Sequence, residues 1–201
     1  MARQLVQSGQ DVSHLVLVMM DEYLLPGADG LEYAPASAPW SCHHFVQSEM
    51  AGLRGAVAWF PHPSDPPAYD ARIAAAGGID LFLLASGASD GHVAFNPPGS
   101  DRLTTTRIVA LSEDTRRDNL QTFPSFGDIA AVPRHGISVG IATITSAREA
   151  IMVVWGTGKR LTLRRMLEAE DYDAAWPATV IHACAVREIV CDADAAAGCL
   201  A

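Results

Sequence analysis

One stretch near the middle of the chain constrains its fold more than any other. Residues 79–85 form an apolar run that is too short to span a membrane and is bounded by turn-forming residues. Such a run is typical of a strand that is buried on both faces of a parallel sheet. The small-residue loop 86–89 follows and leads directly into Asp90, Gly91 and His92. Because open α/β sheets bind ligands at the carboxyl ends of their strands, the stretch predicts an acid and an imidazole placed for proton transfer.

A second apolar run, at residues 14–20, predicts another central strand. It leads into Asp21 and Glu22, so a second pair of carboxylates is expected at a strand's carboxyl end. Taken alone, these two acids could equally cap a helix or lie in solvent. Residues 26–44 are rich in proline, glycine and other small residues, and we expect a long irregular loop of the kind that often forms a lid.

The rest of the chain alternates between predicted strands and helices. Strands are expected at residues 56–60, 107–111, 136–139, 150–155 and 189–191. Helices are expected at residues 68–76, at residues 113–119 with Ser112 as the cap, and from 156 to about 168. The glycines that open the last helix expose backbone amides that suit an anion. The alternation predicts a single α/β domain over residues 1–201, with a Rossmann-like, mostly parallel sheet that is covered by helices on both faces.

Composition narrows the function. With 201 residues, of which 49% are hydrophobic, the chain is long enough to bury a substantial core. A net charge of −9 without a compensating Lys/Arg cluster argues against nucleic-acid binding, and no apolar run suits a membrane helix or a signal peptide. The four cysteines lack metal-type spacing, so we expect reduced thiols and a cytoplasmic protein; they are Cys42, Cys184, Cys191 and Cys199.

Several motifs occur in an order that points to one family. They are Met20-Asp21-Glu22-Tyr23, Gly78-Ile79-Asp80-Leu81, Asp90-Gly91-His92-Val93-Ala94-Phe95-Asn96, Thr106-Arg107-Ile108, Ile137-Ser138-Val139-Gly140, Gly156-Thr157-Gly158-Lys159 and Ile189-Val190-Cys191-Asp192. From about residue 15 onward the sequence resembles the glucosamine-6-phosphate deaminase/isomerase family. The Asp-Gly-His tripeptide alone is weak evidence, but it is specific when Val-Ala-Phe-Asn follows it and Met-Asp-Glu-Tyr precedes it.

The resemblance implies a reaction on a phosphorylated 2-amino-sugar, with fructose 6-phosphate and ammonia as the products. Asp21 matches the base that removes the C2 proton. His92 matches the group that promotes ring opening, and Asp90 would orient that imidazole.

The remaining family positions imply contacts with the substrate. Arg107 and Lys159 would hold the phosphate, and Glu22, Gly91 and Asn96 would contact the sugar. The resemblance implies no metal and no organic cofactor. The expected partner is a small-molecule sugar phosphate, with no nucleic acid and no membrane, and a homo-oligomer is compatible with the family.

The sequence departs from the family pattern at three places. Pro97 stands where the family has a glutamate, and proline offers neither an acid nor a backbone donor. The family's opening strand and its Gly/Ser/Thr phosphate loop are not found, so we expect the first strand of the family fold to be absent. Cys184 occupies a family histidine position and His182 lies two residues earlier; neither receives a role.

Two other functions stay open. The Pro97-Pro98-Gly99 sequence is similar to a motif end in the related 6-phosphogluconolactonases, whereas Glu22-Tyr23 and Phe95-Asn96 belong to the deaminase side. Pro97 also leaves room for a non-catalytic relative that binds sugar phosphates. Surface or loop roles are expected for four other histidines: His43, His44, His62 and His135.

Overall fold

The structure is a computed structural model that describes residues 2–199. Within these residues nine strands form three sheets. The strands are β1 (Val16–Val18), β2 (Asp21–Gly27), β3 (Gly30–Tyr33), β4 (Val57–Trp59), β5 (Leu81–Leu84), β6 (Arg107–Ala110), β7 (His135–Ser138), β8 (Glu149–Val154) and β9 (Arg187–Cys191).

Seven α-helices and three 3-10 helices connect the strands within the described residues. The α-helices are α1 (Ala2–Gln7), α2 (Cys42–Glu49), α3 (Pro67–Ala75), α4 (Glu113–Thr122), α5 (Ile141–Thr145), α6 (Arg160–Glu168) and α7 (Ala193–Ala196). The 3-10 helices are η1 (Pro124–Phe126), η2 (Thr157–Lys159) and η3 (Pro177–Ala183). None of the helices in the described part of the chain has the length and hydropathy needed to cross a membrane.

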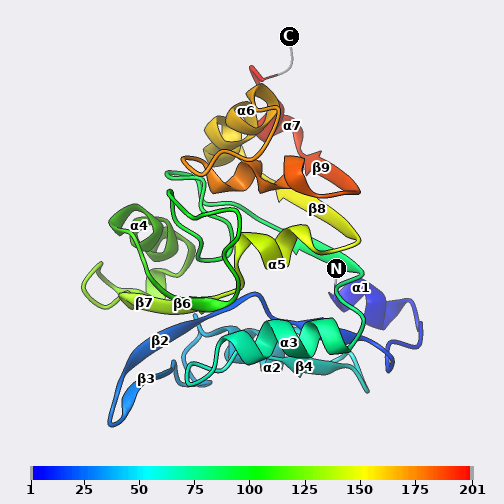
Figure 1. The fold of residues 1–201 in the computed structure, drawn as a ribbon, viewed down its shortest axis with the longest axis vertical. Helices are drawn as coiled ribbons and strands as arrows, with labels where there is room; N and C mark the ends of the chain where they lie inside the picture. Colours follow the sequence, from blue (N-terminus) through cyan, green and yellow to red (C-terminus); the bar gives the residue numbers. More distant parts are fainter. Residues whose placement is uncertain (1, 200–201) are drawn as a thin grey trace.

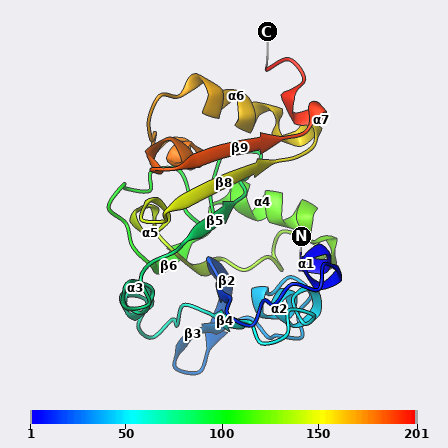
Figure 2. The same ribbon diagram turned by 90° about the vertical axis from the view of Figure 1, so that its right-hand side faces the viewer.

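Two of the sheets are parallel, which confirms the α/β class. One contains β1 and β4, and the other has the order β5-β8-β9 (Figures 1 and 2). Between residues 2 and 199, β1 pairs only with β4 and β5 pairs only with β8, so each of these strands keeps one unpaired edge.

The third sheet is antiparallel, with the order β3-β2-β7-β6, and the sequence did not predict it. Asp21 and Arg107 both pair with Ser138 of the central strand β7, so the three residues form one row across the sheet. The prediction of an irregular loop over residues 26–44 was wrong in part. A β2–β3 hairpin occupies its beginning and the first turn of α2 its end, which leaves residues 34–41 irregular.

The burial of the two apolar runs differs from the prediction. β5 buries Phe82 and Leu84 but leaves Leu81 46% exposed, so only one of its faces is buried. β1 is not central, because within residues 2–199 its second edge pairs with no strand, and Val16 is 45% exposed. The β5-β8-β9 sheet has one open face: Val153 of β8 lies on the same face as Leu81 and is 40% exposed, so the expectation of helices on both faces does not hold for this sheet.

Two hydrophobic cores meet at the loop that follows β5. The larger core packs β5 and β8 against α5, α6 and η3, and Val93 belongs to it. The smaller core lies on the antiparallel sheet, where Tyr23 packs against Phe95 with ring centroids 4.8 Å apart. Since Val93 and Phe95 come directly after the Asp90–His92 turn, the loop that carries these two residues is fixed by both cores.

We predict that Gly140→Ala destabilises the fold. A Cβ at Gly140 would lie 2.0 Å from the backbone oxygen of Thr104, which cannot move without breaking its hydrogen bond from Ala142. Overpacking of this kind costs about 1–3 kcal/mol. Urea unfolding should therefore show a lower midpoint than wild type. Gly158→Ala is the matched control, because its Cβ would meet nothing within 4 Å, and equal midpoints for the two variants would contradict the packing.

Candidate active site

Four of the predicted site residues follow parallel strands at their carboxyl ends. Asp21 comes shortly after β1, and Asp90 and His92 lie in the loop after β5. Lys159 ends η2, directly after β8. The charge of His92 acts on Asp21, and the charge of Asp90 acts on Lys159, so these groups face a common region. This is the edge at which open α/β sheets bind ligands.

Asp90 and His92 form the central pair of the site. Nδ1 of His92 lies 2.6 Å from Oδ1 of Asp90, which also accepts the His92 backbone N–H at 3.1 Å. A carboxylate can only accept, so Nδ1 carries the proton and Nε2 is left as the nitrogen that can exchange protons with a ligand. Both side chains are largely buried.

The first turn of α4 holds the other oxygen of Asp90. Oδ2 accepts hydrogen bonds from the hydroxyls of Ser112 and Thr115, at 2.9 and 2.8 Å. Burial alone would raise the pKa of Asp90, but the hydrogen bonds and charge of His92, with the Thr115 hydroxyl, hold this pKa well below its usual range. Asp90 is therefore a fixed negative charge behind the imidazole. The sequence identified Ser112 as the cap of this helix but missed its bond to Asp90.

Two glycines permit the close packing around this pair. A Cβ at Gly87 would lie 2.2 Å from Nδ1 of His92 and 2.9 Å from Oδ1 of Asp90. Gly91 has φ +66°, and a Cβ there would lie 2.4 Å from the ring of Trp176. The expected substrate contact of Gly91 remains a prediction, but its conformation and its packing already require glycine.

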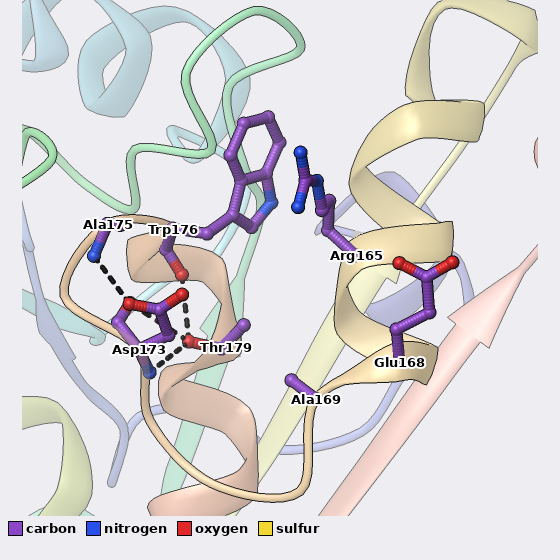
Figure 3. A pocket seen from close by; sticks show the side chains of 7 residues that line it. All are labelled: Arg165, Glu168, Ala169, Asp173, Ala175, Trp176 and Thr179. Carbon is purple, nitrogen blue, oxygen red and sulfur yellow. Dashed lines mark hydrogen bonds between the residues drawn. The ribbon is translucent and has the colours of Figure 1, made fainter.

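Trp176 also borders a cavity of about 250 Å³ on α6 and η3. Figure 3 shows the indole ring beside Arg165 of α6, with the guanidinium carbon 5.8 Å from the ring centroid. Asp173 and Thr179 form hydrogen bonds on the same side of the cavity. None of the predicted site residues lines this cavity. It adjoins the Asp90–His92 turn through Trp176, whose ring packs against Gly91.

Asp21 is the carboxylate whose environment differs most from that of Asp90. Burial raises its pKa to about 6, and the charge of Glu22 adds to the rise. The thiol of Cys42, at 3.3 Å from Oδ1, and the charge of His92 act in the opposite direction. A carboxylate with a pKa near neutrality is suited to act as a general base.

Glu22, the next residue, is fully buried and links β2 to the first turn of α2 by hydrogen bonds. Oε1 accepts the backbone N–H groups of Tyr23 and Cys42, at 2.8 and 3.1 Å. Oε2 accepts the Ser41 hydroxyl, the His43 N–H and Nδ1 of His43, at 3.0, 2.9 and 2.6 Å. Although burial opposes it, this set of donors lowers the pKa of Glu22. Contact with substrate, which the resemblance implied, would require one of these bonds to be given up.

The prediction of a surface or loop role for His43 was wrong. His43 lies in the first turn of α2, where it bonds to Glu22 and stacks on Phe60 with ring centroids 3.6 Å apart. His44 lies in the same helix, and His135 lies in β7 rather than in a loop. A histidine two residues after a serine N-cap was the available signal in the sequence, but its partner Glu22 is 21 positions away.

The two expected phosphate ligands have different neighbours. The Lys159 ammonium donates to the backbone oxygen of Ser86 and faces Asp118 and Asp90, while burial lowers its pKa. Arg107 donates to Asn96 Oδ1 at 2.9 Å and to the Ser100 hydroxyl at 3.3 Å. Burial also lowers the pKa of Arg107.

Asn96 is fully buried and links the loop to the antiparallel sheet. Its amide nitrogen donates to the backbone oxygens of Val93 and Val139, at 3.0 and 2.8 Å, while its oxygen holds Arg107. Ala94, inside this turn, has φ +49° and is the one residue other than glycine with positive φ in the described chain. Asn96 therefore positions Arg107, and its contact with a sugar stays a prediction.

Asp118 of α4 was not predicted from the sequence. It accepts the backbone N–H groups of Ala88 and Ser89, at 2.8 and 3.0 Å, and so shapes the loop that leads to Asp90. The sequence feature that could have revealed Asp118 is the polar buried face of α4, on which Thr115 and Asp118 are three positions apart.

One cluster has the composition of a cation site. Ligand atoms of Asp90, His92 and Asp118 lie within 4.8 Å of one another. Each oxygen of both carboxylates already accepts a hydrogen bond from the protein, and Nδ1 of His92 is bonded to Asp90. A metal bound through these atoms would have to compete with the existing hydrogen bonds.

The residues at which the sequence departs from the family pattern make contacts within the fold. His182 bonds through Nε2 to the backbone oxygen of Met166 at 2.7 Å, which ties η3 to α6. Cys184 is buried in the larger core. Pro97 is half-buried, and its backbone oxygen accepts two bonds from Ser100.

Fold and site together define an α/β protein with a hydrogen-bonded acid–imidazole pair at the carboxyl edge of parallel strands. Comparison with known proteins makes this class specific. Residues 2–190 match the family described as glucosamine-6-phosphate isomerases/6-phosphogluconolactonase. The chain belongs to this family.

Two similar relatives carry the name glucosamine-6-phosphate deaminase. That of Beutenbergia cavernae is 37% identical over 82% of this chain and 62% of the relative, and that of Shouchella clausii is 32% identical over 94% of this chain and 75% of the relative. The chain thus spans less than two thirds of the Beutenbergia relative's length.

Solved structures agree on the fold. A monomeric glucosamine-6-phosphate deaminase superposes with a TM-score of 0.84 at 25% identity, over 98% of this chain and 81% of that one. A 6-phosphogluconolactonase from Shewanella baltica superposes with a TM-score of 0.68 at 14% identity, over 94% and 76% of the two chains. The second likeness supports the fold alone.

We predict that Gly87→Ala separates His92 from Asp90. The new methyl group would occupy the space of Nδ1, so the imidazole must rotate away from the carboxylate. In NMR spectra of the imidazole nitrogens, the strongly hydrogen-bonded Nδ1–H resonance of His92 should disappear. Gly158→Ala should leave that resonance in place; if Gly87→Ala also keeps it, the contact is not as described.

Proposed function

We propose that the chain is an amino-sugar-phosphate deaminase/isomerase that converts glucosamine 6-phosphate to fructose 6-phosphate and ammonia. The observation that carries the proposal is the opposed environment of two carboxylates in one site. Asp21 is half-buried with a raised pKa, whereas Asp90 is held ionised behind His92. Such a pair separates a proton-abstracting base from a histidine-orienting acid.

Ring opening is the first step of the proposed reaction. His92 takes the proton of the C1 hydroxyl through Nε2 and returns a proton to the ring oxygen as the C1–O bond to the ring breaks. Asp90 stabilises the imidazolium that exists between these transfers, because its negative charge lies 2.6 Å from Nδ1.

The second step moves the double bond. The carboxylate of Asp21 removes the C2 proton of the open-chain aldehyde. The C–H electron pair forms the C1–C2 double bond, the C1 carbonyl oxygen takes the electron pair of its broken π bond and a proton from solvent, and the product is an enolamine. Return of a proton to C1 gives an imine at C2, to which water adds. Ammonia then leaves and the ketose phosphate remains. Asp21 must be ionised to accept the proton, which its pKa of about 6 allows at neutral pH.

We propose Lys159 and Arg107 as phosphate ligands. Both are partly buried, so their charges are weakly screened and attract a dianion more strongly than exposed cations would. The cytoplasm is the proposed compartment, because the four cysteines are free thiols, as expected in a reducing environment.

Asp21→Asn tests the proposal directly. The amide keeps the shape of the side chain but cannot accept the C2 proton, so ammonia release from glucosamine 6-phosphate should fall by at least about 10²-fold. Ammonia should be measured with a coupled enzyme assay, with Cys199→Ser as the control variant. Equal rates from wild type and Asp21→Asn would refute the assignment, and hydrolysis of 6-phosphogluconolactone without ammonia would replace it.

The rate should also depend on pH in a defined direction. The pKa of Asp21 is raised to about 6, so the carboxylate becomes protonated as pH falls through that value. Because only the ionised form removes the C2 proton, kcat should drop about tenfold for each unit of pH below 6. A pH–rate profile from 4.5 to 8 checks this, and a flat acidic limb would exclude Asp21 as the base.

A further inference from the structure

Cys42 touches the proposed base. Its Sγ lies 3.3 Å from Oδ1 of Asp21, and the thiol donates. Within the described residues Oδ2 of Asp21 accepts no hydrogen bond from the protein. The two oxygens of this carboxylate are therefore unequal, since one is engaged and the other is open.

The backbone of Cys42 is held by a hydrogen bond to the buried carboxylate of Glu22. Its N–H donates to Oε1 of Glu22, and its neighbours Ser41 and His43 both donate to Oε2. Ser41 also caps α2. Since Glu22 directly follows Asp21, the same buried carboxylate holds both sides of the Cys42–Asp21 contact.

The thiol keeps its proton. Burial raises the pKa of Cys42 well above its usual value, and the charges of Asp21 and Glu22 raise it further. Cys42 is thus a neutral S–H donor at any pH at which the protein is expected to work, and it is not a nucleophile.

We propose that Cys42 is a positioning residue that holds Oδ1 of Asp21 and leaves Oδ2 as the oxygen that takes the C2 proton. The inference rests on the proposed function. A thiol suits this task because it is a weak donor. It orients the carboxylate but withdraws little of its basicity, whereas a stronger donor would make Asp21 a poorer base.

The surroundings of Asp21 allow this effect to be isolated. Glu22 on the same strand raises its pKa, His92 on the facing loop lowers it, and Cys42 on α2 lowers it by hydrogen bonding. Because the thiol is uncharged, substitution of Cys42 leaves the contributions of Glu22 and His92 in place. Cys42→Ser also keeps the size of the side chain, and with it the burial that is the main cause of the raised pKa of Asp21.

Two substitutions should move the acidic limb of the pH–kcat profile in opposite directions. Cys42→Ala removes the donor, so the limb should move to higher pH by about half a unit to one unit, and kcat at its plateau should fall roughly tenfold with little change in KM. Cys42→Ser supplies a stronger donor, so the limb should move to lower pH, and kcat at the plateau should fall less than in Cys42→Ala because Asp21 keeps its position but becomes a weaker base. Cys199→Ser, whose thiol contacts the backbone oxygens of Arg160 and Ala195 rather than Asp21, is the matched control and should match wild type.

A second measurement does not depend on turnover. The carboxyl carbon of Asp21, assigned by comparison with Asp21→Asn, can be titrated by ¹³C NMR in the wild type and both variants. Its midpoint should rise in Cys42→Ala and fall in Cys42→Ser. If Cys42→Ala does not fold, the direction in which the Asp21 midpoint shifts in Cys42→Ser decides whether the thiol holds Asp21.

The outcomes separate the two proposals. Unchanged midpoints would overturn the contact, and shifted midpoints with an unchanged kcat plateau in Cys42→Ala would overturn the positioning role. Shifts in the stated directions together with the loss in kcat support it. No ammonia from the wild type would refute the proposed function, and the titration alone would then decide whether Cys42 holds Asp21.

Discussion

The buried carboxylate of Glu22 is the interaction on which the site depends. Removal of a carboxylate from water costs several kcal/mol, and a single hydrogen bond to a charged group returns about 1.5–3 kcal/mol. Glu22 accepts five such bonds, from Tyr23, Ser41, Cys42 and twice from His43, and they lower its pKa although burial opposes this. The bonds join β2 to the first turn of α2, and the position of Asp21 follows from that junction.

The other half of the site is fixed by packing rather than by a buried charge. The turn with Asp90 and His92 lies between two hydrophobic cores, with Val93 in one and Phe95 in the other. The absence of a side chain at Gly87 lets the imidazole approach its carboxylate. Two unrelated solutions thus place two carboxylates in one region and give them opposite pKa shifts, which is the physical basis for their different proposed roles.

Within the described residues the sequence predicted seven of the nine strands and the helices α3, α4 and α6, because short apolar runs and turn residues mark them locally. The Ser112 cap is also a local feature and is confirmed. Asp90 and His92 are in hydrogen-bonding contact, and their roles stay predictions. The antiparallel sheet was missed because the row of Asp21, Ser138 and Arg107 joins residues far apart in the chain, and periodicity does not reveal strand direction. Periodicity equally cannot show whether an apolar strand such as β1 has a neighbour on each side, so its exposure was not foreseen.

The unpaired edges of β1 and β5 have a consequence for how the protein behaves at high concentration. Each leaves a row of backbone donors and acceptors open within the described chain, and neither strand carries a charge or a proline that would discourage pairing. Val16 and Leu81 expose apolar surface beside these rows. Such edges are templates for adding a strand from another molecule, so we expect association at high concentration to begin at the same two strands whose carboxyl ends lead into the proposed site.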